Sequence, residues 1–305
     1  MRINKQQILA ICKKLDQKLT KYRFLAAGGL NECYLVTTPR ARYVVKIENN
    51  KGYSEREHKN LLLATEKLAP KVYLFDKSGK IIPKTYMVQE FLKGKHPPIQ
   101  LSNDFIIKMA KWFKQLHSIK SSQIEPNERK RIYSLGHWAN QSCNKLKKIQ
   151  MPINQDLRKQ IEDRFQTTLV LCKENNDLFR SRKTFPLVHG DPWRENVFIE
   201  KKGIRLIDWE FAGFVLGERD LIIFIRAYNL SNQQKALFLK TYGYPQTTIA
   251  RKKINVVAQL LTCSDLLWLL ERINSIEKGK VGKRQQQRTK REAIKKIRKI
   301  LSKSK

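Results

Sequence analysis

Apolar and polar residues alternate through most of the stretch from Tyr22 to Leu92. A period of two is typical of half-buried strands, so the pattern predicts an antiparallel sheet. One stretch breaks the alternation, because residues 54–69 carry apolar side chains at helical spacing and end before Pro70. Another amphipathic helix, marked by Ile8 and Ile11, precedes the sheet. The expected strands are 22–29, 32–38, 42–48, 71–75 and 85–91.

Helical periodicity dominates the rest of the chain. The short stretch 93–98 (KGKHPP) has no apolar pattern and contains Gly94 and two prolines, so it is expected to join two lobes. The helices predicted beyond it are 102–118, 135–149, 154–177, 218–229, 231–241 and 249–276. No internal repeat is apparent in the sequence.

These patterns predict an α+β chain made of two lobes. The expected parts are an N-terminal lobe at 1–92, a linker at 93–98, a helical C-terminal lobe at 99–277 and a basic tail at 278–305. The N-terminus lacks the apolar core of a signal peptide, and the longest uninterrupted apolar runs are far too short to span a bilayer. We therefore expect a cytoplasmic protein. Five scattered cysteines without a CxxC pair suggest neither a disulfide framework nor a zinc site.

Positive charge is concentrated at the C-terminal end. The chain has 62 Lys and Arg against 27 Asp and Glu, a formal net charge of +35. Thirteen of the bases lie in residues 278–305, together with one acid, Glu292. Such a segment is either a solvated tail or an anchor for nucleic acid or a membrane surface. Ile294, Ile297 and Leu301 recur there at helical spacing, so the segment can also dock an apolar stripe on the core.

Polar residues that a fold does not need lie among the apolar runs of 187–210 (LVHGDPWRENVFIEKKGIRLIDWE). The second half of this stretch has the form of a hairpin, with Gly203 suited to the left-handed position of a three-residue loop. If Glu200 pairs with Ile204, Asn196 lies opposite Asp208 at the open end of the hairpin. An amide oxygen and a carboxylate are hard donors that suit Mg²⁺ better than zinc.

Asp191 lies five residues before Asn196, the interval between the base and the metal-binding Asn in the kinase catalytic loop. In that loop the Asp orients the substrate hydroxyl, while the Asn and a later Asp hold metal. The alternative is a polar turn, in which Asp191 caps a loop and Asn196 ends a strand. Four residues of suitable type at consistent spacings favour a metal-assisted phosphoryl-transfer site.

The stretches HGDPWRENV, LIDWEFAG and ERDL resemble the aminoglycoside phosphotransferase and choline kinase family, and the resemblance extends from about Phe24 to Leu270. That family consists of small-molecule kinases with a protein-kinase-like fold. The resemblance implies a small antiparallel sheet in the N-terminal lobe, a mainly helical C-terminal lobe, and ATP or GTP with Mg²⁺ as cofactors. Glu195 departs from the glycine frequent at its position. Asp220 is expected to brace the catalytic loop.

The nucleotide side involves residues of the predicted sheet and helix. Gly28 and Gly29 lie between two strands, where backbone N–H groups can approach phosphates, although a plain hairpin turn explains them as well. Lys46 lies mid-strand among apolar neighbours, a costly place for an ammonium group without an anionic partner. The resemblance implies that Lys46 contacts phosphates and pairs with a glutamate, for which Glu57 is the candidate. A capping box with Ser54 is the alternative use of Glu57.

The resemblance also implies that backbone groups of Glu90 and Leu92 bind the adenine edge. The Trp-Glu pair after the LID run resembles the choline, thiamine and related kinase branches, which makes Glu210 a candidate for contact with the acceptor. Asp265 and Trp268 lie on a late helix of the kind that walls the acceptor pocket in the family. A Trp in an apolar helical stripe is also a common core residue, so both readings of Trp268 stay open.

The expected activity is transfer of the γ-phosphoryl group of ATP, or of GTP, to a hydroxyl of a small molecule. An amino alcohol or a thiamine-like cation is the first candidate for the acceptor, and aminoglycosides, sugars and nucleosides are alternatives. A non-catalytic kinase-like protein that binds nucleic acid or a membrane through its basic surface is an alternative of another class. The intact set of catalytic residues argues against that alternative.

Overall fold

The computed structural model describes residues 3–27, 31–49, 52–150, 152–277 and 283–302. The chain divides into two compact units, each assembled from two stretches of sequence. The first unit comprises Met1–Ser121 and Pro186–Tyr244, and the second comprises Ser122–Phe185 and Pro245–Lys305. The lobe boundaries expected at 92 and 98 describe a different division and stay a prediction.

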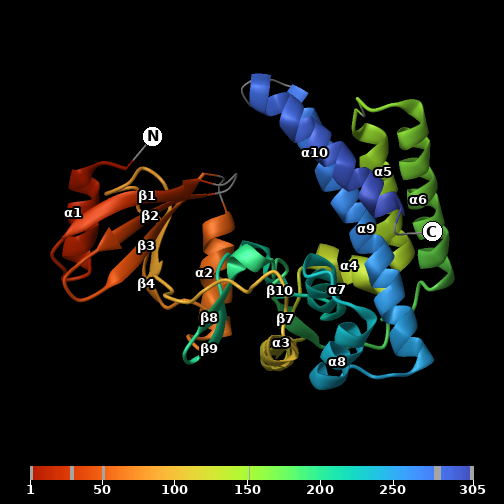
Figure 1. Ribbon diagram of the computed structural model, residues 1–305, viewed down its shortest axis with the longest axis horizontal. Coiled ribbons are helices and arrows are strands. Elements are labelled where there is room, and N and C mark those ends of the chain that lie inside the picture. The colour runs from red at the N-terminus through yellow and green to blue at the C-terminus, as the bar shows by residue number, and fades with distance from the viewer. Residues whose placement is uncertain (1–2, 28–30, 50–51, 151, 278–282, 303–305) are drawn as a thin grey trace. The chain divides into compact units, whose positions relative to one another are not determined.

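A five-stranded antiparallel sheet belongs to the first unit (Figure 1). Its strands are β1 (Lys21–Ala27), β2 (Asn31–Thr37), β3 (Arg42–Glu48), β4 (Val72–Asp76) and β5 (Tyr86–Glu90), in the order β1-β2-β3-β5-β4. Helix α1 (Lys5–Lys14) packs Ile8 and Ile11 against one face, where Val45 and Ile47 of β3 are buried. The five strands and this helix confirm the periodicities of the sequence.

Helix α2 (Tyr53–Ala64) packs with a different set of side chains from the sheet. Its residues Leu61 and Ala64 are buried in a cluster that includes Met87 of β5. Met87 pairs with Lys46 across the β3–β5 ladder, and paired residues point to the same face of a sheet. The alternation of β3 therefore directs Lys46 away from α1 and towards α2.

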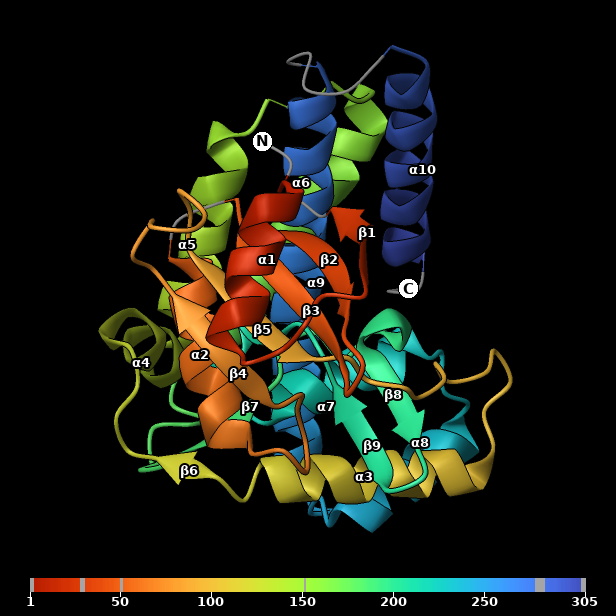
Figure 2. The ribbon, with the colours of Figure 1, turned by 90° about the vertical axis from the view of Figure 1, so that its left-hand side faces the viewer.

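The remaining elements of the first unit follow the sheet in two stretches of sequence. They are α3 (Asn103–Leu116), β6 (Lys120–Ser121), β7 (Phe185–Val188), η1 (Arg194–Asn196), β8 (Val197–Glu200), β9 (Gly203–Leu206), η2 (Trp209–Phe211), β10 (Gly213–Phe214), α7 (Glu218–Ala227) and α8 (Asn232–Tyr242). Strands β10, β7 and β6 form a small sheet. Strand β8 pairs with β9, and the two lie side by side in Figure 2. Aromatic side chains of α3, α7 and α8, among them Phe113, Phe224 and Phe238, fill the core beside them.

The β8–β9 hairpin differs by one residue from the predicted register. Glu200 pairs with Gly203 and not with Ile204, so the loop has two residues where three were expected. The backbone N–H of Ile207 donates to the carbonyl of Asn196 at 2.9 Å. The prediction that Asn196 lies directly opposite Asp208 is therefore wrong, because a slip of one residue changes every pair of a hairpin.

The second unit is helical throughout its described residues apart from its share of β7 and the connections. Its helices are α4 (Pro126–Tyr133), α5 (Leu135–Lys148), α6 (Gln155–Glu174), α9 (Thr248–Glu277) and α10 (Lys283–Ser302). Helix α4 was not predicted, since Ile132 is its one buried residue. Helix α9 is long and apolar enough over Thr248–Ile276 to cross a membrane. However, 56% of its most apolar stretch is buried inside the protein, which is usual for the core helix of a folded unit.

Candidate active site

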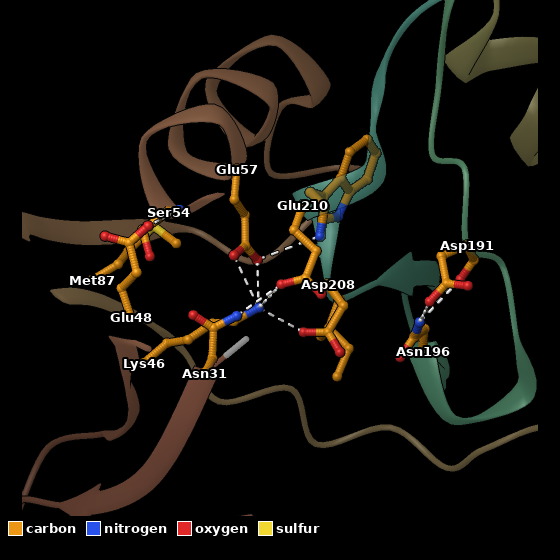
Figure 3. Close-up of polar contacts among 12 residues, drawn as sticks. Asn31, Lys46, Glu48, Ser54, Glu57, Met87, Asp191, Asn196, Asp208 and Glu210 are labelled. Carbon is orange, nitrogen blue, oxygen red and sulfur yellow. Dashed lines mark hydrogen bonds and ion pairs between the residues drawn. The ribbon is translucent and has the colours of Figure 1, made fainter. Parts of the chain in front are cut away.

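Lys46 lies at the centre of a cluster of carboxylates within the first unit (Figure 3). Its ammonium nitrogen is 2.9 Å from Glu57 and 2.7 Å from Oδ1 of Asp208. Glu210 is the third carboxylate, at 3.7 Å. Burial by itself lowers the pKa of Lys46, but these three carboxylates raise it well above its usual value. The ammonium group is therefore charged and positioned by elements far apart in the sequence.

The contacts of Glu57 decide between the two uses expected for it. Glu57 is fully buried and accepts no hydrogen bond of a capping box, because α2 has no side-chain cap. The N–H of Ser54 instead donates to Oε1 of Glu48 at 3.1 Å, and the buried Ser54 Oγ has no hydrogen-bond partner among the described residues. The capping box is therefore absent, and the side chain of Glu57 is held by Lys46 and by the N–H of Trp209 at 3.4 Å.

Glu210 points into the same cluster and is held by a residue that the sequence did not single out. Nδ2 of Asn31, at the start of β2, donates to Oε2 of Glu210 at 2.7 Å. The pKa of Glu210 is raised to about 7, chiefly by burial; the charge of Lys46 opposes the rise, and those of Glu57 and Asp208 contribute to it. An asparagine two residues after a pair of glycines is typical of a turn, so only the fold reveals this contact.

The catalytic-loop candidates form a second group beside the Lys46 cluster. Nδ2 of Asn196 donates to Oδ2 of Asp191 at 2.9 Å and to its backbone carbonyl at 3.0 Å. Burial raises the pKa of Asp191 to about 6; the charge of Asp208 adds to the rise, while the hydrogen bond from Asn196 opposes it. Asp191 and Asn196 are thus in direct contact within the loop.

Asp220 holds the backbone of this loop. Its carboxylate accepts hydrogen bonds from the N–H groups of His189 and Gly190, both at 2.7 Å, and lies 3.2 Å from Nε2 of His117. Asp220 is completely buried, and although burial raises its pKa, the hydrogen bonds and the two histidines lower it below its usual value. These contacts confirm the bracing role expected for Asp220.

Gly190 and His189 explain why the loop approaches the segment after β9 so closely. Gly190 has a φ of 82°, and a Cβ atom there would lie 2.5 Å from the carbonyl oxygen of Phe211. Only glycine fits that position. Nε2 of His189 lies 2.9 Å from the carbonyl of Ile207, and Nδ1 lies 3.2 Å from the N–H of Asp191. The proton of this buried imidazole therefore resides on Nε2, and the ring joins the loop to the end of the hairpin.

Asp208 leaves the hairpin in a left-handed conformation, with φ 62° and ψ 65°. Non-glycine residues in this region are uncommon, and they concentrate at functional sites. The turn directs Oδ1 of Asp208 to Lys46, while its side chain remains 41% exposed. Asn60, 6% exposed, helps to hold the segment that follows by donating to the carbonyls of Trp209 and Ala212.

The donors at this site fit a magnesium ion held jointly with phosphates. The described residues contain no group of three or more His, Cys, Asp or Glu side chains that could hold a metal by themselves. Mg²⁺ is usually bound by one or two carboxylates together with substrate phosphates. Both side-chain hydrogen bonds recorded for Asn196 use its nitrogen, so its oxygen and the exposed Asp208 carboxylate match that need.

The segment after β5 runs along the β8–β9 hairpin. Arg205 of β9 donates to both oxygens of Glu90, at 2.5 and 2.8 Å, and to Glu200 at 2.6 Å. Glu200 also accepts from the N–H of Lys93 at 3.1 Å. The backbone N–H of Glu90 already donates to the carbonyl of Lys71. Of the two backbone groups of Glu90, the carbonyl is therefore the candidate for a contact with the adenine base.

The remaining predicted residues lie either outside the described residues or in the second unit. Gly28 and Gly29 lie outside the described residues. Asp265 and Trp268 belong to the second unit, and both are exposed on α9. The guanidinium of Arg272 lies 5.2 Å from the Trp268 ring, which shows a surface side chain in a cation–π contact and not a core residue.

Comparisons with known proteins bear on this site and this fold. A family model described as the phosphotransferase enzyme family (APH) matches residues 21–251, most of the chain. The chain belongs to this family. It is an enzyme that transfers phosphoryl groups, and the resemblance seen in its sequence is confirmed. A search of curated proteins finds no match.

Solved structures show the fold of this phosphotransferase. It is similar to a spectinomycin phosphotransferase in complex with ADP and spectinomycin, with a TM-score of 0.69 and 15% identity over 99% of this chain and 98% of that chain. It is also similar to choline kinase LicA from Streptococcus pneumoniae, with a TM-score of 0.65 and 21% identity over 96% and 98% of the two chains. An ethanolamine kinase from Plasmodium vivax has a TM-score of 0.56 and 18% identity over 83% and 76%. The predicted kinase-like α+β fold is confirmed.

Proposed function

We propose that this phosphotransferase moves the γ-phosphoryl group of ATP, or of GTP, to a hydroxyl of a small molecule. The observation that carries the proposal is the gathering of Lys46, Asp191, Asn196 and Asp208, from three separate stretches of sequence, within one unit. The transition state of phosphoryl transfer is highly charged, so catalysis rests on positioning and charge neutralisation. Charge neutralisation would come from Lys46 and from a metal held by Asn196 and Asp208. Positioning of the hydroxyl would come from Asp191.

In this proposal Asp191 orients the acceptor hydroxyl and accepts its proton. Burial raises the pKa of Asp191 to about 6. At neutral pH the carboxylate is then mainly ionised, and it is a stronger base than an ordinary aspartate, so it can accept the proton of the hydroxyl. Asn196 fixes the carboxylate by its hydrogen bond to Oδ2. Lys46 neutralises charge on the phosphates, and Glu57 holds its ammonium group in place.

Asn196 and Asp208 would hold Mg²⁺, which neutralises charge on the phosphate oxygens when it is bound. Asp208 also pairs with Lys46. The carbonyl of Glu90 and the N–H of Leu92 are the groups proposed to bind the adenine edge. Gly28 and Gly29 are proposed to approach the phosphates from the loop before β2.

The acceptor proposed is an amino alcohol or a thiamine-like cation. Choline and ethanolamine kinases are among the proteins of similar fold, and Glu210, Asp265 and Trp268 are the proposed contacts. A cationic acceptor needs such local acids and rings, because the net charge of +35 repels it at a distance. An aminoglycoside is the second candidate, favoured by the similarity to a spectinomycin phosphotransferase.

Acceptor-dependent formation of ADP tests the proposal. Purified protein with Mg²⁺ and ATP is assayed against choline, ethanolamine, thiamine, spectinomycin, sugars and nucleosides, with Asp191→Asn as the matched control. We expect one class to stimulate turnover in the parent protein and not in the variant. For a cationic acceptor, Asp265→Asn and Trp268→Ala should raise its KM with little effect on the KM for ATP. If an acceptor stimulated Asp191→Asn as much as the parent protein, the mechanism would be contradicted. If the acceptor were anionic or neutral, the proposal of a cationic substrate would be wrong, but the proposed phosphotransfer would stand.

A further inference from the structure

Helix α10 carries basic side chains that the proposed phosphotransfer does not use. Ala293 and Ile297 are 3% and 0% exposed and pack in the core of the second unit. At 100° per residue, the exposed bases lie on the opposite face, within a length of about 12 Å. These exposed residues are Arg291, Lys295, Lys296, Arg298 and Lys299. The segment expected as a basic tail is thus, in its described part, a helix docked by its apolar stripe.

The five exposed bases of α10 outnumber the one exposed acid of this part of the helix, Glu292. Among the described residues, none of these five side chains makes a recorded ion pair. Some exposed bases of other helices do form ion pairs. Arg158 of α6 lies 2.9 Å from Glu162, and Lys108 of α3 lies 2.7 Å from Asp104. The exposed face of α10 therefore presents five cations that have no ion pair within the described part of the chain, on a helical backbone.

We propose that this face of α10 binds the phosphate backbone of a nucleic acid. Duplex DNA carries one negative charge per roughly 1.7 Å of its axis, and each neutralised phosphate releases condensed counterions. Because α10 is already folded and docked, binding does not require the helix to be ordered first. The row Arg291, Lys295 and Lys299 follows an i, i+4 spacing, so its three cations repeat at about 6 Å along the helix.

A membrane surface is the competing polyanion. Helices that bind at a membrane interface insert an apolar face between the lipids, and stable anchoring takes two signals. The apolar residues of α10 are packed with side chains of α6 and α9, such as Phe165 and Leu266. Only the electrostatic signal is left for a membrane, so a nucleic acid fits this face better.

Salt-dependent binding of a labelled single-stranded DNA oligonucleotide to the full chain tests the proposal. The variant Arg291→Gln, Lys295→Gln, Lys296→Gln, Lys299→Gln removes four charges and leaves the buried residues in place. The matched control removes four exposed charges from the first unit, by the substitutions Lys18→Gln, Lys21→Gln, Lys67→Gln and Lys80→Gln. Both variants have the same net charge. A difference between them therefore distinguishes binding at α10 from attraction by the overall positive charge of the protein.

We expect the α10 variant to reduce the slope of log K against log salt by up to about 3 between roughly 50 and 200 mM, as four phosphate contacts on a single strand require. The control should retain the parental slope. Equal losses in the two variants, or an unchanged slope in the α10 variant, would overturn the proposal. So would binding of phosphatidylserine vesicles, lost in the α10 variant, without binding of the oligonucleotide.

Folding is checked by the thermal midpoint of each variant. If the fourfold variant does not fold, Lys295→Gln with Lys299→Gln should reduce the slope by about 1.4, and Lys295→Arg with Lys299→Arg should retain it. Loss of slope in the arginine pair would show an effect of packing and would contradict the proposal. The outcome is independent of the phosphotransfer, since no residue assigned to catalysis is changed.

Discussion

The ammonium nitrogen of Lys46 lies 2.7 Å from Oδ1 of Asp208, a residue 162 positions further along the chain. The contact joins the middle of β3 to the left-handed turn after β9. The carboxylate of Asp208 would therefore contact both Lys46 and the metal ion, because Asp208 is also a proposed metal ligand. Nucleotide binding would then exchange part of the Lys46 contact for metal and phosphate.

Asp208→Ala should weaken binding of Mg²⁺-ADP at least about tenfold, a loss of about 1.4 kcal/mol. The loss follows from removing one of two protein ligands of the metal. Titration calorimetry with Mg²⁺ and with EDTA separates the causes. With EDTA the variant should bind ADP no worse than the parent protein, since a negative charge near the phosphates is gone. An equal loss in both conditions would rule out a metal-mediated role.

Asp191→Asn should lower turnover by about 10² to 10⁴, the usual contribution of a positioned acid or base. Nucleotide affinity should change little, because the side chain contacts Asn196 and not Lys46. The asparagine keeps an oxygen to accept that hydrogen bond. Single-turnover kinetics and a nucleotide titration measure the two effects. A loss of less than about tenfold would count against the catalytic role.

Glu57→Gln should lower the free energy of unfolding by about 1.5 to 3 kcal/mol, the contribution of a hydrogen bond to a charged group. It should also raise the KM for ATP, since Lys46 loses one of its anchors. Ser54→Ala is the matched control from the same helix, and it removes a buried hydroxyl without a hydrogen-bond partner in the part of the chain that the structure describes. Denaturant unfolding should place Ser54→Ala within about 0.5 kcal/mol of the parent protein. A comparable loss in both variants would restore the capping interpretation.

Ile297→Ala should destabilise the second unit by about 2 to 5 kcal/mol, because a fully buried side chain leaves a cavity. Lys296→Ala, one residue away on the exposed face, should have little effect. Thermal unfolding of the two variants measures the difference. Removal of 280–305 is then expected to lower stability, which would not occur if α10 were a free tail. Equal midpoints for the two variants would contradict the docked helix.

Stability should fall in acid partly through Asp76. Its carboxylate accepts hydrogen bonds from Lys14 at 2.6 Å, Ser78 at 2.7 Å and Tyr86 at 3.2 Å. The hydrogen bonds from Lys14 and Ser78 lower the pKa of Asp76 below its usual value. A lowered pKa in the folded state stabilises the fold above the unfolded value of about 3.9, and this contribution is lost as the pH falls towards the folded value.

Urea unfolding from pH 7 to pH 3 checks this expectation. Asp76→Asn should be less stable than the parent protein at pH 7, and the difference should narrow below about pH 4. Asp104→Asn is the control, because its ion pair with Lys108 lies on the surface and contributes little at any pH. A difference for Asp76→Asn that stays constant across this range would exclude the titration.

Local pattern determined much of this protein before any tertiary contact was known. Alternation predicted the five strands, and the apolar repeats predicted α1, α2 and most later helices, because these periods reflect the geometry of each element alone. The five-residue interval between Asp191 and Asn196 matched that of the kinase catalytic loop, and in the fold the two side chains are in contact. Helix α4 escaped prediction because Ile132 is its one buried residue, which leaves no stripe to detect.

Tertiary structure decided what local pattern left open. Whether Glu57 capped its helix or met Lys46 depended on the packing of α2 beside β3, and the capping box is absent. The hairpin register depended on a loop of two residues instead of three, which the sequence around Gly203 does not distinguish. The contact of Asn31 with Glu210 spans 179 positions and has no periodic signal. Such contacts arise from chain segments that meet only after the elements pack, so a pattern of period two or 3.6 cannot encode them.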